Sequence, residues 1–91
     1  LAGSDLSKAR LDGGSFQQAH FQGACLQQAE VTKCDFSRSS FSGAQLSGMR
    51  GKKVILTDCC LDGCGCDDMN LQEAEFGNVS LYNCSPDISF S

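Results

Sequence analysis

The most reactive side chains in this 91-residue chain are seven cysteines and a single histidine, His20. Four of the cysteines form a dense run whose residue type suits a zinc ion: Cys59, Cys60, Cys64 and Cys66. Zinc needs thiolates that converge on one point in a tetrahedral arrangement. The repeat described below directs Cys60 outward and the other three inward on different sides, so the sequence predicts no metal site.

The cysteine count is odd, and five of the seven occupy inward positions of the repeat. This pattern favours reduced thiols that pack as small apolar groups. A Cys64–Cys84 disulfide is the open alternative, because the repeat stacks these two residues within bridging range. Reduced thiols indicate a cytoplasmic location. Two glycosylation sequons, beginning at Asn78 and Asn83, leave a luminal or secreted location open.

A Cys25–His20 pair has the residue types of a nucleophilic enzyme. The repeat would place both side chains on a solvated convex face with no pocket, where neither is activated. We therefore expect no enzymatic activity, no cofactor and no small-molecule substrate. Basic residues are too few and too dilute for a nucleic-acid partner, and no apolar run is long enough for a membrane span.

Bulky apolar side chains recur at every fifth position, and this spacing dominates the sequence. The series, with Gly51 and Cys66 as its two exceptions, runs through Leu6, Leu11, Phe16, Phe21, Leu26, Val31, Phe36, Phe41, Leu46, Gly51, Leu56, Leu61, Cys66, Leu71, Phe76 and Leu81. A period of five matches neither the 3.6 of a helix nor the 2 of a strand, so it indicates a repeat architecture. Small or soft residues stand two positions before each apolar centre. This predicts a short strand with two inward side chains, followed by a polar corner.

Units such as Ala44-Gln45-Leu46-Ser47-Gly48 resemble the pentapeptide-repeat family, whose unit reads Ala-Asp/Asn-Leu-x-x. The resemblance covers residues 4–88. It implies an all-β fold, a right-handed quadrilateral parallel β-helix with one pentapeptide per side, twenty residues per coil and about four coils. We expect the β-helix over residues 1–88 and a tail or end cap over 89–91. The chain lacks an initiator Met and a visible cap, so we expect a fragment or domain of a larger protein.

A register of twenty residues predicts how the side chains stack. One inward column would hold Phe16, Phe36, Leu56 and Phe76. Gly51 leaves a gap in another column, and we expect the side chains of Met49 and Met69 to turn into it, because thioethers fill irregular space well.

Outward positions predict a charge ladder of Arg10, Glu30 and Arg50 along one edge. The two halves of the chain also differ sharply in charge. Residues 1–53 hold all seven Lys and Arg beside four acids, a net charge of +3, whereas residues 54–91 hold seven acids and no Lys or Arg, a net charge of −7.

These features favour a non-catalytic scaffold that binds another protein, whose identity the sequence does not give. The candidate contact residues are six acids and two apolar side chains predicted to point outward: Asp58, Asp62, Asp67, Asp68, Glu73, Glu75, Ile55 and Tyr82. A first alternative follows from the family resemblance, since some members, of the quinolone-resistance type, bind DNA gyrase by mimicking DNA. A second alternative is the targeting part of a secreted bacterial effector.

Overall fold

The computed structural model describes residues 1–80, Tyr82, Cys84 and the backbone of Ser89–Phe90. Its named strands are β1 (Arg50–Lys52), β2 (Asn70–Gln72) and β3 (Ser89–Phe90). They form one parallel sheet in the order β1-β2-β3. No helix occurs among the described residues, so none there has the length and apolarity to cross a membrane. Within residues 89–91, predicted to be a tail or end cap, Ser89–Phe90 form β3, which pairs with β2.

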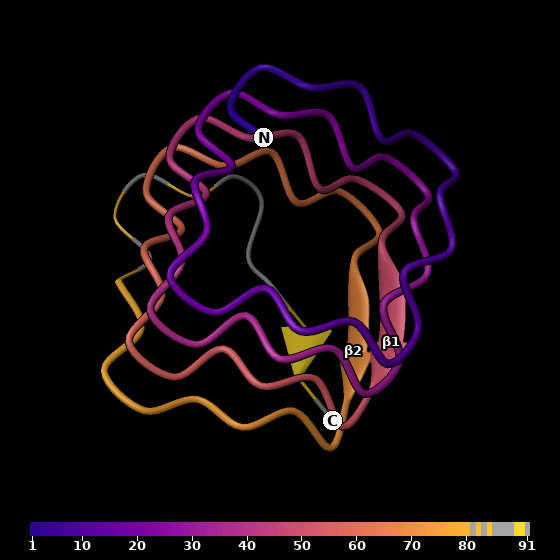
Figure 1. The fold of residues 1–91 in the computed structure, drawn as a ribbon, viewed down its shortest axis with the longest axis vertical. Helices are drawn as coiled ribbons and strands as arrows, with labels where there is room; N and C mark the ends of the chain where they lie inside the picture. The colour runs from indigo at the N-terminus through magenta and orange to yellow at the C-terminus, as the bar shows by residue number, and fades with distance from the viewer. Residues whose placement is uncertain (81, 83, 85–88, 91) are drawn as a thin grey trace.

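Isolated parallel bridges extend this pairing over the described residues from Asp5 to Ser80, and each bridge joins residues twenty apart. The bridges fall into four ladders, which begin at Asp5, Arg10, Ser15 and His20. Figure 1 shows successive turns of the chain stacked with similar outlines, with β1 and β2 side by side. We call each twenty-residue turn a coil. The predicted all-β architecture and its register of twenty are confirmed.

Each corner holds one residue with a positive φ angle, two positions after the apolar centre. These residues occur at every fifth position from Gly3 to Asn78, and ten of the sixteen are polar residues other than glycine. Most corners are closed by a hydrogen bond from the amide three residues after the centre, as in Ala24 N to Phe21 O at 3.0 Å. A positive φ at the third residue matches a type II turn. The corners therefore accept polar side chains as well as glycine.

The core is a set of stacked apolar columns. Phe16 and Phe36 stack with ring centroids 5.4 Å apart and an interplanar angle of 14°, and Phe21 and Phe41 stack at 4.9 Å and 2°. Rings of neighbouring columns meet edge to face, as do Phe21 and Phe36 at 5.8 Å. Aromatic pairs favour these offset-stacked and edge-to-face arrangements. The predicted column that begins at Phe16 is thus confirmed for its first two rings, whereas Phe76 is 36% exposed.

Two valines lie closest to the side-chain position that Gly51 leaves empty. A Cβ atom added at Gly51 would lie 2.8 Å from Val54 Cγ2 and 2.9 Å from Val31 Cγ2. Met49 and Met69, which were expected to fill the gap, are both buried in the same core. Gly51 stays in register opposite Leu71. The close approach of the two valines explains why this centre has no side chain.

Inward cysteines donate hydrogen bonds as well as filling space. In the small column, each thiol or hydroxyl bonds the carbonyl of the apolar centre 23 residues earlier. The residues are Cys34, Ser39, Cys59, Cys64 and Cys84, at 2.6–2.9 Å. All seven cysteines, Cys64 and Cys84 included, are free thiols in the structure. Each thiol thereby gives a backbone carbonyl at a corner one more hydrogen bond than the backbone alone would supply.

We predict that Gly51→Ala lowers the free energy of unfolding by about 1–3 kcal/mol, because the new methyl group would overpack against Val31 and Val54. Urea denaturation measures the change. Gly65→Ala is the matched control, since a Cβ atom there meets nothing within 4 Å. Equal losses in the two variants would contradict the overpacking at Gly51.

We also predict that the free energy of unfolding falls as the pH rises from about 9 toward 11. Burial raises the pKa of the Cys59 thiol from 9.0 to about 11, so above pH 9 the unfolded chain loses this proton before the folded chain does. Cys59→Ser keeps a hydroxyl donor toward Phe36 O and should make this fall shallower. Urea denaturation at a series of pH values tests it, and an unchanged slope would refute it.

Candidate interaction surfaces

The six candidate acids surround the coil and do not gather on one face. Asp58, Asp62, the Asp67–Asp68 pair and Glu73 lie at successive corners, five residues to each side, whereas Glu75 lies on a side in the bridge ladder with Ile55. Three pairs of the predicted set come together. Asp67 and Asp68 are consecutive residues at one corner, Asp62 accepts a hydrogen bond from the Tyr82 amide, and Ile55 forms a β-bridge with Glu75. The acidic half of the chain therefore presents its carboxylates at several separate positions and not on one face.

The carboxylates of two of these acids accept hydrogen bonds from other residues of the protein. Asp62 accepts hydrogen bonds from Ser80 Oγ at 2.5 Å and from the Tyr82 amide at 2.9 Å. These bonds, the Ser80 hydroxyl first, hold the pKa of Asp62 below its ordinary value. Asp58 accepts a bond from Asn78 Nδ2 at 3.2 Å. Both carboxylates serve to join consecutive coils.

The remaining four acids are free for an external contact. The side chains of Asp67, Asp68, Glu73 and Glu75 are exposed and make no hydrogen bond or ion pair with the described part of the chain. Asp67 and Asp68 are neighbours, so two negative charges meet at their corner. This corner is the strongest of the acidic candidates for a contact with a cationic group.

The two apolar candidates differ from each other. Tyr82 is 73% exposed, and its amide bonds Asp62, so this ring stands at an acidic corner. Ile55 is only half-buried, because it lies in a bridge ladder between Asp35 and Glu75. Tyr82 therefore presents more surface to a partner than Ile55 does.

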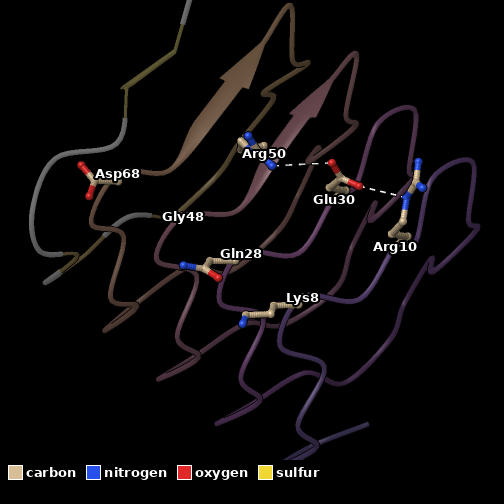
Figure 2. A pocket seen from close by; sticks show the side chains of 7 residues that line it. All are labelled: Lys8, Arg10, Gln28, Glu30, Gly48, Arg50 and Asp68. Carbon is tan, nitrogen blue, oxygen red and sulfur yellow. Dashed lines mark ion pairs between the residues drawn. The ribbon is translucent and has the colours of Figure 1, made fainter.

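Sequence reasoning missed a groove that runs along one edge of the stack. We call it the corner groove, a hollow of about 600 Å³ lined by Lys8, Arg10, Gln28, Glu30, Gly48, Arg50 and Asp68. A smaller hollow of about 250 Å³ continues it past Asp67 and shares three of its residues, Gln28, Gly48 and Asp68. Figure 2 shows Lys8 and Gln28 on one side of the groove and the row of Arg10, Glu30 and Arg50 on the other.

Corner geometry aligns the first side of the groove. Lys8, Gln28, Gly48 and Asp68 are equivalent corner residues of consecutive coils, and all have φ between 58° and 73°. Backbone bonds hold them in line: Lys8 N donates to Gln27 O at 2.8 Å, and the amides of Gln28 and Gly48 repeat this contact. Gly48 contributes no side chain, so the groove is open at its centre. The spacing of twenty was visible in the sequence, and it was the signal that could have revealed this row.

An ion-paired ladder forms the second side. Arg10 Nε lies 3.0 Å from Glu30 Oε2, and Arg50 Nη2 lies 3.6 Å from Glu30 Oε1. The predicted ladder of alternating charge is thus confirmed. All three side chains are more than a third exposed, so each pair contributes little to stability. The ladder fixes the positions of two guanidinium groups beside the groove.

The cysteines and the histidine do not assemble into a reactive centre in the described part of the chain. No three His, Cys, Asp or Glu side chains come together there as metal ligands would. Cys25 Sγ lies 3.0 Å from Ser7 Oγ, while His20 Nδ1 faces Gln22 Nε2 at 3.5 Å. Hydrogen bonding with Cys64 lowers the pKa of the Cys66 thiol, which is itself buried.

A coil stack with left-handed corners, parallel ladders and inward aromatic columns defines a class of β-solenoid proteins. The model of pentapeptide repeats matches residues 1–38 and 32–65 in eight copies. The chain therefore belongs to the pentapeptide-repeat family. No relative matches it among the curated proteins.

Solved structures support the same fold. The pentapeptide repeat protein Rfr23 from the cyanobacterium Cyanothece 51142 matches with a TM-score of 0.86 at 21% identity, over 89% of this chain and 56% of that one. A pentapeptide repeat protein from the thylakoid lumen of Arabidopsis thaliana matches at 0.50 and 21%, over 91% and 61%. QnrB1, a plasmid-mediated fluoroquinolone resistance protein, matches at 0.56 and 18%, over 92% and 54%. The chain thus spans little more than half the length of these proteins.

Proposed function

We propose that this chain is a non-catalytic scaffold that binds a protein partner through the acidic corner at Asp67 and Asp68. In this proposal the scaffold is a right-handed β-helix of about four coils in the cytoplasm, without a small-molecule, nucleic-acid or membrane ligand. The observation that supports this proposal best is that the two carboxylates are exposed and have no partner within the described chain. They are also adjacent, whereas Asp58 and Asp62 are bonded to neighbouring coils.

Physical reasoning supports a cationic partner surface. Residues 54–91 carry no Lys or Arg, so nothing within that half neutralises its seven acids. Two like charges at one corner repel each other, and a bound cationic group relieves this repulsion. The hydrogen-bonded coils hold the corner in place before binding, which reduces the entropy lost on association.

A DNA-mimic function receives less support. The likeness to QnrB1 at 18% identity concerns the fold. The negative charge is confined to residues 54–91, and the rest of the chain carries a net charge of +3. A uniform acidic rod would be expected for a protein that imitates a duplex.

We predict that Asp67→Lys/Asp68→Lys reduces partner capture at least fivefold and leaves the circular dichroism spectrum unchanged, because both side chains are exposed and unpaired. Affinity capture with quantitative mass spectrometry compares the variant with the native chain. Glu73→Lys/Glu75→Lys changes the charge of the same coil by the same amount and is the matched control. Unaltered capture in the Asp67/Asp68 variant would refute the assignment of this corner.

We expect no inhibition of DNA gyrase supercoiling by the purified chain at micromolar concentration. Inhibition that is lost in the Asp67/Asp68 variant would replace the scaffold proposal with DNA mimicry.

A further inference from the structure

We propose that the corner groove binds an extended peptide segment of the partner protein, one that carries an acidic and a basic residue four positions apart. This inference rests on the proposed protein-binding function and adds the chemistry of the bound segment. The acidic residue would lie against Lys8 and Arg10, and the basic residue against Asp67 and Asp68.

Opposite charges remain unneutralised at the two ends of the groove. Lys8 makes no ion pair or side-chain hydrogen bond with the described residues, so its charge is not neutralised. Arg10, beside it, pairs with Asp12 at 3.8 Å as well as with Glu30 at 3.0 Å. At the other end, Asp68 lies beyond Gly48 in Figure 2 and has no partner in the described chain. The groove is therefore cationic at one end and anionic at the other.

The middle of the groove is balanced and polar. Glu30 contacts both arginines, so its charge is neutralised within the ladder. The Gln28 amide makes no hydrogen bond with the described residues and faces the groove, where it can pair with a peptide backbone group. Gly48 adds no side chain that would obstruct the path.

The distance between the two charged ends of the groove determines how far apart the two charged residues of the peptide must be. Lys8 and Asp68 are three coils apart, and strands pair about 4.8 Å apart, so the two ends are separated by roughly 14 Å. An extended chain rises about 3.3 Å per residue and directs positions i and i+4 to the same face. Four residues therefore span the groove with both charged side chains pointing into it. A single small anion could engage only the Lys8 end.

The test titrates the ¹⁵N-labelled protein at low ionic strength with two synthetic peptides, followed by NMR chemical shifts. Ac-GKSTSEG-NH2 has Lys and Glu four positions apart, and Ac-GKSETSG-NH2 has the same composition with a spacing of two. We expect the first to shift the Gln28 side-chain amide and the Gly48 amide, and to bind at least about threefold more tightly than the second, a ratio set by the loss of one exposed ion pair. Equal affinities would overturn the inference.

Gly48→Gln places a side chain in the centre of the groove and should weaken binding of the first peptide about fivefold. The backbone accepts this change, because Gln18 and Gln28 hold the same corner conformation. Gly63→Gln makes the identical substitution at another glycine corner and should leave binding unchanged. Equal weakening in both variants would contradict the groove as the binding site.

A titration with inorganic phosphate tests whether the groove is only an anion-binding site and not a peptide-binding site. Shifts at Lys8 and Arg10 with phosphate, without shifts for the first peptide, would overturn the peptide proposal. If Asp67→Lys/Asp68→Lys abolishes partner capture and Gly48→Gln does not, the scaffold function stands and this inference fails. If neither variant affects capture, both fail.

Discussion

Backbone hydrogen bonds between coils are the constraint on which the other features of this structure depend. They join each coil to the next with a fixed offset, as in Leu26 N to Gln45 O at 2.8 Å and Gln45 N to Ala24 O at 2.9 Å. This offset stacks like positions on one another, so aromatic rings form columns and charged residues form ladders. A slip of one residue would turn the inward set outward along the whole strand. The periodicity of the sequence and the backbone pairing therefore reinforce each other.

Those same bonds explain why the candidate surfaces lie at corners. On the sides, outward residues stack closely enough to interact with one another, as Glu30 does with two arginines. Corner residues adopt the left-handed conformation, and several of their side chains have no partner among the described residues. Lys8 and Asp68 are such residues. Ladders thus hold the coils in register, while corners present charge to the surroundings.

The sequence predicted the inward positions, the register and the Arg10–Glu30–Arg50 ladder, because a strict period converts position directly into direction. It did not predict how the space at Gly51 is filled. That depends on the rotamers of Val31 and Val54, which periodicity does not specify. The corner groove was missed for a related reason. It arises from the missing side chain of Gly48 between larger neighbours, and its significance becomes visible only when the corners are aligned in three dimensions. Predictions that involve Leu81 and Asn83 lie outside the described residues.

The buried thiols can report local opening of the coil stack. Cys34, Cys59 and Cys64 are 0–2% exposed, and each thiol is held against a carbonyl of the preceding coil. Burial raises the pKa of the Cys34 and Cys59 thiols, and a hydrogen bond with Cys66, together with burial, raises the pKa of Cys64. The three thiols therefore stay protonated and are poor nucleophiles while the coils stay closed. An alkylating reagent can reach them only when adjacent turns separate. Because Cys34 lies about one coil from Cys59, and Cys64 lies on the side next to Cys59, their relative alkylation rates would record where the coils separate first.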